Sequence, residues 1–465
     1  MKDYKNLKLA YIGGGSRAWA RNLMGDLAKE GEIAGEVRLY DIDAESAKEN
    51  AIIGNALSKR DDVKGKWQYN VYDSLDSCLY GVDFVIISIL PGTFKEMASD
   101  VHAPEKYGIY QSVGDSSGPG GIVRALRTIP MFKVIAEAIK QNCPNAWVIN
   151  FTNPMTVCVN TLYKVFPKIK AFGCCHEVFA TQKLFARILE ELRGIKATRD
   201  DIDVNVLGIN HFTFVDKAHY KNIDLFPLLD EYIKKGGAEN NGADENWANK
   251  NFISHNKVKF DLYKRYGVLG AAGDRHLAEF CPGKWYLESP EKVKEYGFAL
   301  TTVDWRIEDL NKKIEKTKEL LAGKEFEIID TGEESVRQIK ALLGLSNFVT
   351  NVNIPNVGQM ENLKLGAVVE TNAYFSGDSV IPVHAGHLPE PVSARVERIV
   401  HCQEMTVEAG LTGNYELAFN AFINDPNVCL SMEDARKLFD EMLYNTKEYL
   451  PFYDKYIESR NISKE

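Results

Sequence analysis

The stretch Phe-Gly-Cys-Cys-His-Glu-Val, residues 172–178, gathers two thiols, an imidazole and a carboxylate behind a short apolar segment, Ile169–Phe172. Thiolate and imidazole are ligands for transition metals, and both side chains also serve as nucleophiles or proton donors. Two small buried cysteines and a helix-capping histidine would give the same residues without any chemistry. The neighbouring segments of the chain must decide between these interpretations.

A second set of functional residues lies at the start of the chain. Gly13, Gly15 and Ala18 fit the pattern G-x-G-x-x-G/A, directly after the apolar segment Leu7–Ile12. Such glycines allow a tight turn and let the backbone approach a pyrophosphate, which the following helix N-terminus attracts. Ser16 belongs to the same turn. The pattern predicts a dinucleotide site.

Acidic residues follow the next predicted strand, Val37–Tyr40. Asp41 stands a little over ~20 residues past the glycines, where a carboxylate binds a ribose hydroxyl, and this favours NAD over NADP. Asp43 is an alternative ligand or a turn residue. Ser88 lies at the end of the apolar segment Phe84–Ile89, whose following loop we expect beside the nicotinamide.

Two further polar positions follow predicted elements. Asp115 lies in the glycine-rich segment 113–121, which we expect to be a loop because glycine disfavours regular structure. Asn153 follows the strand Trp147–Phe151 and precedes Pro154, so its amide is a candidate ligand, although Asn-Pro is also a common turn.

These residues share one feature, which is their position just past a predicted strand. Six strands separated by helical patterns predict a doubly wound parallel α/β sheet of the Rossmann type: Leu7–Ile12, Val37–Tyr40, Trp67–Val71, Phe84–Ile89, Trp147–Phe151 and Ile169–Phe172. The carboxyl ends of parallel strands line one crevice, so we expect the candidate residues to converge there.

The second half of the chain has a different pattern. Segments 201–207 and 212–220 alternate like the strands of a hairpin, with His211 at the corner as a candidate metal ligand or a structural histidine. Asp274 and Arg275 stand in a glycine-rich loop after Tyr266. A solvated charged loop is the alternative there, but its apolar neighbours favour a site.

Length and composition limit the classes of protein to which the chain can belong. The 465 residues predict two domains, a dinucleotide-binding domain at 1–195 and an α+β catalytic and oligomerisation domain at 196–465. The net charge of −9 and the lack of a basic stripe argue against a nucleic-acid partner, and no apolar run is long enough to span a bilayer. Eight cysteines without framework spacing favour free thiols in the cytoplasm.

Taken together, the motifs resemble glycoside hydrolase family 4, whose members look like lactate and malate dehydrogenases in fold. The resemblance covers essentially the whole chain and rests on segments 13–16, 114–121, 150–154, 173–176, 208–211 and 266–274. The runs at 175–178 and 273–277 look most like the α-galacturonidase branch.

The resemblance implies a mechanism outside the two-carboxylate scheme of other glycosidases. NAD takes hydride from C3 of the sugar, the C2 proton becomes acidic, the aglycone leaves from C1, water adds, and the hydride returns. Cys175 and His211 match the family's metal ligands, for Mn²⁺ or another divalent transition metal, and His176 matches the group that protonates the leaving oxygen.

The remaining roles follow from the same resemblance. Asp274 is the candidate base at C2, with Tyr266 as its rival, and Asp115 matches a residue that supports the base. Asn153 is expected to bind the sugar, and Arg275 is expected to bind a uronate carboxylate as a bidentate partner. The substrate is then a small oligosaccharide or uronide, and a homodimer or homotetramer is expected, as relatives form.

Several alternatives remain open from the sequence. An α-glucuronidase, or a neutral α-glucosidase or α-galactosidase of the same family, would carry similar motifs. An NAD-dependent 2-hydroxy acid dehydrogenase would share the first half but needs no Cys/His metal pair. A non-enzymatic NAD-binding regulator is disfavoured by the number of reactive groups at one crevice.

Overall fold

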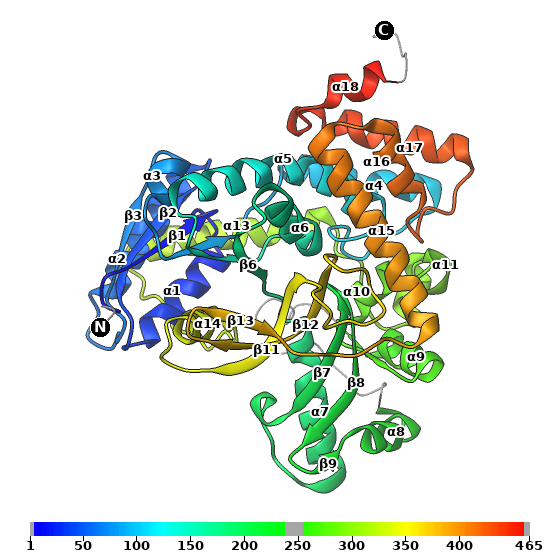
Figure 1. The fold of residues 1–465 in the computed structure, drawn as a ribbon, viewed down its shortest axis with the longest axis horizontal. Helices are drawn as coiled ribbons and strands as arrows, with labels where there is room; N and C mark the ends of the chain where they lie inside the picture. Colours follow the sequence, from blue (N-terminus) through cyan, green and yellow to red (C-terminus); the bar gives the residue numbers. More distant parts are fainter. Residues whose placement is uncertain (1–3, 238–253, 460–465) are drawn as a thin grey trace.

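The computed structural model describes residues 4–237 and 254–459, which form two β-sheets (Figure 1). The larger sheet has the order β13-β12-β11-β6-β5-β4-β1-β2-β3. Its first six strands are parallel: β1 (Leu7–Ile12), β2 (Gly35–Tyr40), β3 (Trp67–Val71), β4 (Phe84–Ile87), β5 (Trp147–Asn150) and β6 (Lys170–Gly173). This is the 3-2-1-4-5-6 order of dinucleotide-binding folds, so the predicted doubly wound sheet is confirmed.

Helices cover both faces of the parallel strands. They are α1 (Trp19–Lys29), α2 (Ala44–Ser58), α3 (Leu75–Leu79), α4 (Phe94–His102), α5 (Gly118–Asn142) and α6 (Met155–Val165). Alternate residues of β1 enter two separate cores, because successive side chains of a strand point to opposite faces. Leu9 and Tyr11 pack in the core that contains α1, whereas Ala10 and Ile12 pack in the core that contains α5.

Helix α5 begins earlier than the sequence predicts. The glycine-rich segment was expected to be a loop through residue 121, but the helix starts at Gly118 and has Pro119 in its first turn. Proline suits the first turn because the N–H it lacks would have no partner within the helix. The glycines of this turn are all buried, so close packing rather than a loop explains them.

Strands from the second half extend the same sheet. Strand β11 pairs antiparallel with β6 through Asn353 and Gly173, and two more antiparallel strands complete the edge. The elements of this region are α13 (Val303–Leu321), α14 (Ser335–Leu342), β11 (Phe348–Pro355), β12 (Val368–Ser376) and β13 (Ser379–Pro382). Because both halves share this sheet, the predicted division at residue 195 stays a prediction.

The smaller sheet lies in the lower part of Figure 1. It contains β7 (Asp203–Ile209), β8 (Phe212–Tyr220), β9 (Ile223–Asp224) and β10 (Leu269–Gly270). Strands β7 and β8 pair antiparallel, which confirms the predicted hairpin. The helices nearby in the sequence are α7 (Glu177–Arg193), α8 (Phe226–Lys234), α9 (Lys257–Tyr266), α10 (Asp274–Glu279), α11 (Gly283–Tyr286) and α12 (Pro290–Glu295).

The C-terminal helices lie against α4 and α5 at the upper right of Figure 1. They are α15 (Glu390–Thr412), α16 (Tyr415–Ile423), α17 (Met432–Asn445) and α18 (Tyr453–Glu458). Their apolar side chains form a core with α5 in the same chain, so the expected homo-oligomer stays a prediction. Within the described ranges, every helix is too short or too polar to span a bilayer.

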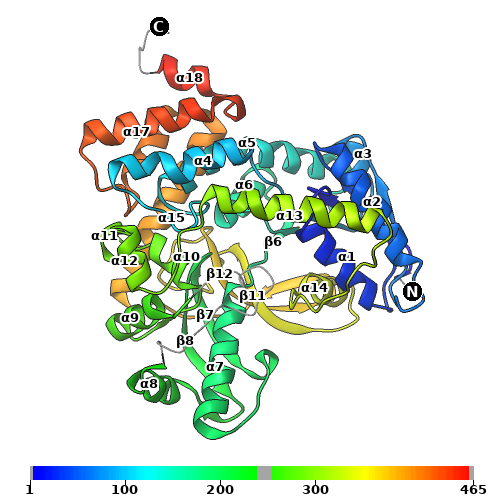
Figure 2. The same cartoon turned by 180° about the vertical axis from the view of Figure 1, so that it is seen from behind.

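Figure 2 shows α13 crossing the back of the molecule, and this helix contacts both α2 and α4.

Behind the glycine-rich segment, Arg127 of α5 and Asp100 of α4 form a fully buried ion pair. Arg127 Nη1 lies 2.9 Å from Asp100 Oδ1, and its Nε donates to the Pro91 carbonyl at 2.9 Å. The pair therefore fixes two helices and the loop after β4 relative to one another.

Replacing Asp100 by Asn should destabilise the protein by about 3–5 kcal/mol, because it leaves the Arg127 charge buried without its counterion. Urea unfolding followed by circular dichroism would measure this loss. The exposed pair of Lys437 and Glu433 provides the control, and Glu433→Gln should leave the midpoint unchanged. Equal midpoints for the two variants would contradict the structural role of the buried pair.

Candidate active site

The glycine turn after β1 forms a cradle at the carboxyl edge of the sheet. Gly13 has φ +94°, and a Cβ atom there would lie 1.9 Å from the Ser88 carbonyl oxygen, so only glycine fits. Gly15 N donates to Asp41 Oδ2 at 2.8 Å, and Ser16 Oγ accepts an N–H of the first turn of α1 at 3.1 Å. All five predicted cofactor residues therefore meet at the N-terminus of α1, and this geometry fits a bound pyrophosphate.

The two acidic residues after β2 take different positions. Asp43 is the N-cap of α2, and its carboxylate accepts the Ser46 N–H at 3.1 Å. Asp41 lies against the glycine turn itself. Asp43 is therefore a capping residue, and Asp41 is the carboxylate at the cradle.

The adjacent cysteines point into different surroundings. Cys174 Sγ donates to Gln338 Oε1 at 3.0 Å and packs against the core that contains α1. Cys175 is buried beside Met155, and its carbonyl accepts the Asn351 amide at 3.0 Å. Burial raises the pKa of the Cys175 thiol well above its ordinary value. A thiolate at Cys175 therefore needs a nearby cation.

His211 lies at the hairpin corner with φ +63°, a backbone conformation rare for residues other than glycine. Its ring centroid is 4.0 Å from that of His276, and Ser116 Oγ lies 3.2 Å from its Nδ1. Ser116 also donates to Asp115 Oδ1 at 2.7 Å. Burial alone would raise the pKa of Asp115, but Arg124 and the two imidazoles hold it well below its usual range.

Glu177 is a buried carboxylate at the centre of the imidazoles. Its Oε2 accepts the Gly273 N–H at 2.8 Å, and its Oε1 lies 3.6 Å from His276 Nε2 and 3.9 Å from His176 Nε2. Burial opposes ionisation, but His276, His176 and His211 together hold the pKa of Glu177 well below its usual range. Glu177 thus joins the end of β6 to the start of α10, and Glu177 with His176, His211 and His276 is called the imidazole cluster below. The predicted loop at Asp274 and Arg275 is wrong at these two residues, because α10 begins at Asp274.

Cys175 and His211, the predicted metal ligands, are both buried, and their role stays a prediction. Thiolate and imidazole are a suitable donor pair for a divalent transition metal. Among the described residues, no group of three or more His, Cys, Asp or Glu side chains is arranged to hold a metal.

Asn153 is available to a ligand at the end of β5. Its carbonyl accepts Arg124 Nε at 3.2 Å, whereas its side-chain Oδ1 is buried and has no hydrogen-bond partner among the described residues. A buried acceptor without a partner is unfavourable unless a bound molecule supplies the donor.

The two candidate bases engage other partners. Asp274 Oδ1 accepts the Lys259 N–H at 3.0 Å at the start of α9, and burial raises the Asp274 pKa to about 6. The Tyr266 hydroxyl, at the opposite end of α9, lies 3.1 Å from Arg395 Nε. The structure brings neither oxygen into a contact with the imidazole cluster, and the assignment of the base stays a prediction.

Two guanidinium groups lie beside the cluster. Arg275 donates to Thr301 Oγ1 at 3.3 Å, and Arg306 donates to the Val113 carbonyl at 2.9 Å. Burial, together with the neighbouring Arg275 charge, lowers the pKa of Arg306. Its Nε atom is buried and has no partner within the described part of the chain. Two adjacent cations with an unused donor are suited to an anionic ligand.

The glycine-rich segment is held by Glu279 of α10. Its Oε1 accepts the N–H groups of Val113 at 2.6 Å and Gly114 at 2.8 Å. Burial, with the Asp115 charge nearby, raises the Glu279 pKa to about 8.

Several of these groups were missed by sequence reasoning. Glu177 stood inside the Cys-Cys-His-Glu run but received no role, and His276 stood beside Arg275. Glu279 and Arg306 gave no local signal, because ordinary charged helices place similar residues at similar spacing. Only their contacts with residues far along the chain identify them.

Comparison with known proteins agrees with this geometry. The model of the family described as family 4 glycosyl hydrolase matches residues 8–191, and the model of that family's C-terminal domain matches residues 206–428. The α-galacturonidase of Thermoanaerobacterium saccharolyticum is 62% identical over 454 residues, covering 96% of this chain and 97% of that protein.

Two solved structures are similar along nearly the whole chain. The crystal structure of lplD from Bacillus subtilis has a TM-score of 0.89 and 48% identity, over 94% of this chain and 100% of that one. A 6-phospho-α-glucosidase from gut microorganisms, in complex with NAD and Mn²⁺, has a TM-score of 0.78 and 19% identity, over 96% of this chain and 99% of that one. At that identity the second structure supports the fold alone.

The raised pKa of Glu279 predicts a pH dependence of stability. Between about pH 4.5 and 8 the folded state keeps a proton that the unfolded state has lost, so the free energy of unfolding falls as pH rises. Relative to Glu279→Gln, the wild type should lose up to about 1.4 kcal/mol per pH unit across this window. Urea titrations at several pH values would show it. The control is the exposed Glu137→Gln, and parallel profiles for the wild type and Glu279→Gln would contradict the shift.

Proposed function

The chain belongs to family 4 of the glycosyl hydrolases, and from this membership we propose that it is an α-galacturonidase that uses NAD and a divalent metal. The observation that carries the proposal is the pair of guanidiniums, Arg275 and Arg306, beside the imidazole cluster. The relative that is 62% identical along nearly its whole length is an α-galacturonidase, which agrees with a uronate carboxylate at that pair.

The cofactors are supported by the fit of this chain's residues. The glycine turn and Asp41 suit NAD, whereas Cys175 and His211 suit Mn²⁺ or a similar ion. When bound, these groups accept and return the C3 hydride and stabilise negative charge on the C2 and C3 oxygens. The reaction is therefore hydrolysis without net oxidation.

The protein's own residues bind the sugar and move its protons. Asn153 offers its buried Oδ1 to a sugar hydroxyl near the nicotinamide side of the crevice. His176 protonates the glycosidic oxygen as the aglycone leaves C1. Asp115 stays ionised beside His211 and supports the charge balance of the crevice, while Asp274 or Tyr266 removes the C2 proton.

We also propose a cytoplasmic location and a homodimer or homotetramer. A reducing compartment suits the Cys175 side chain, because oxidation would remove a metal ligand. Size-exclusion chromatography with light scattering would determine the oligomeric state.

The purified protein should release p-nitrophenol from p-nitrophenyl α-D-galacturonide only when NAD⁺, Mn²⁺ and a reductant are all present. Omitting NAD⁺, Mn²⁺ or the reductant in turn tests whether each is required, because the residues that fit the two cofactors serve one reaction. The NADH absorbance should not rise. Activity confined to the glucuronide or a neutral glycoside would identify a different substrate and keep the chain's membership of the family. Steady NADH formation from a 2-hydroxy acid without glycoside cleavage would overturn the proposal in favour of a dehydrogenase.

Arg275→Lys should lower kcat/KM for the galacturonide by about 10²-fold, because a lysine ammonium cannot make the bidentate contact with a carboxylate. The affinity for NAD⁺ should change less than about twofold, since Arg275 contacts Thr301, on a different segment from the glycine turn. Kinetics on the galacturonide and fluorescence titration with NAD⁺ separate the two effects. The exposed Arg187→Lys is the control, and equal losses of turnover and NAD⁺ affinity would contradict the assigned role.

A further inference from the structure

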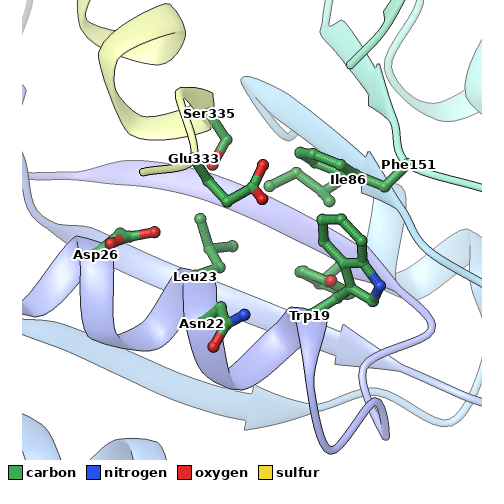
Figure 3. Close-up of a pocket in the computed structure, with 9 residues that line it drawn as sticks. Trp19, Asn22, Leu23, Asp26, Ile86, Phe151, Glu333 and Ser335 are labelled. Carbon is green, nitrogen blue, oxygen red and sulfur yellow. The ribbon is translucent and has the colours of Figure 1, made fainter. Parts of the chain in front are cut away.

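His176 has a second carboxylate partner besides Glu177, and it comes from a distant part of the chain. Its Nδ1 atom lies 3.0 Å from Glu333 Oε1, and only 12% and 8% of the two side chains are exposed. Figure 3 shows the Glu333 carboxylate pointing toward Trp19, with Phe151 and Ile86 on the same side. Both side chains are therefore largely buried, and a hydrogen bond between an imidazole and a carboxylate is stronger there than in water.

The position of Glu333 is set by the segment that carries it. Residues 322–334 run from α13 to α14 across the outer surface of α1 and α2. Thr331 Oγ1 donates to Asp26 Oδ2 at 2.7 Å, and Glu325 pairs with Arg60 at 2.9 Å. This segment is called the strap. Its two anchors hold Glu333 against the dinucleotide-binding half, so the contact with His176 does not depend on one flexible side chain.

The ring of His176 is restricted from its other sides as well. It stacks on Trp19 with centroids 5.8 Å apart and an interplanar angle of 19°. Trp19 in turn packs on Phe151, at 5.2 Å between centroids. With Nδ1 directed to Glu333, the Nε2 atom faces Glu177 and the imidazole cluster, at 3.9 Å from Glu177 Oε1. The two nitrogens therefore face different surroundings.

We propose that Glu333 is a positioning residue for His176, accepting the Nδ1–H bond so that Nε2 is the nitrogen that donates a proton in the crevice. The inference rests on the proposed role of His176 as the proton donor to the leaving oxygen. A carboxylate that accepts one imidazole N–H fixes both the tautomer and the ring orientation, as in other carboxylate–histidine pairs.

The proton balance of the step is simple. The proton passes from Nε2 to the glycosidic oxygen while the C1–O bond breaks and its electron pair stays on that oxygen. His176 is left neutral and keeps its Nδ1–H bond to Glu333, which takes up no proton. Glu333 touches neither substrate nor cofactor in this account, and it acts only through the imidazole.

A structural role is the alternative, in which the ion pair merely fastens the strap. The two roles differ in how they depend on the leaving group. A p-nitrophenolate needs little protonation to depart, whereas a methoxide needs a positioned acid. A loosened strap would slow both substrates alike, because folding and cofactor binding do not depend on the aglycone.

The test compares Glu333→Ala with Glu334→Ala, using the holoenzyme with NAD⁺ and Mn²⁺. Glu334 is the matched control, because its side chain is also 8% exposed and pairs with Arg199 at 3.0 Å on the other side of the strap. Glu333→Ala should lower kcat/KM for methyl α-galacturonide by about 10²-fold and for the p-nitrophenyl galacturonide by less than about tenfold. Glu334→Ala should change both substrates by the same factor.

Two further measurements separate the possible failures. Glu333→Gln should recover at least about tenfold of the loss on the methyl galacturonide, since its amide oxygen still accepts the Nδ1–H bond. Exchange of the C2 proton with D₂O should persist in unreacted substrate, because this step precedes departure of the aglycone. Equal losses on both substrates, or no recovery with Gln, would overturn the inference while leaving the proposed function intact. If the wild type showed neither NAD-dependent cleavage nor C2 exchange, the proposed function itself would be contradicted.

Discussion

The buried carboxylate of Glu177 is the interaction on which the candidate site depends. It opens helix α7 directly after the parallel sheet and accepts the backbone of Gly273 from the second half of the chain. Three imidazoles surround it, and their interaction with the carboxylate lowers the Glu177 pKa although burial opposes ionisation. Through this carboxylate, Gly273 and the start of α10 are attached to the edge of the sheet. The site is therefore built by electrostatic pairing across two regions that are about a hundred residues apart in sequence.

The same principle organises the rest of the crevice. Asp115, Glu177 and Glu333 supply negative charge, while Arg124, Arg275 and Arg306 supply positive charge. Each of these anions has a partner on another element. These pairs hold the loops around the crevice in place and leave the space between the loops open. The buried polar atoms without a partner among the described residues include the Asn153 Oδ1, the Arg306 Nε and the Asp274 Oδ2. These unsatisfied groups indicate where a polar, anionic molecule completes the site.

The fold explains why such groups collect at one edge. Parallel strands β1, β4, β5 and β6 all end there, and β11 adds to β6 from the second half of the chain. The hairpin of β7 and β8 then brings His211 to the Asp115 segment through Ser116. The proposed chemistry needs hydride acceptance, proton transfer and anion binding within a few ångströms. A shared sheet edge with loops from both halves provides this arrangement on a rigid scaffold.

The sequence by itself determined the parallel sheet, the glycine cradle and the hairpin, because strand periodicity, glycine spacing and turn residues act over short distances. It placed β1 and β3 at their observed bounds and gave Cys175, His176 and His211 as candidates. The start of α5 at Gly118 was missed because glycine and proline near a helix start look like a loop. Only the tertiary structure decided that Asp274 caps α9, that Cys174 turns to Gln338, and that Glu333 meets His176. Such contacts depend on packing between distant segments, and the pairing of charges across a fold leaves no periodic trace in the sequence.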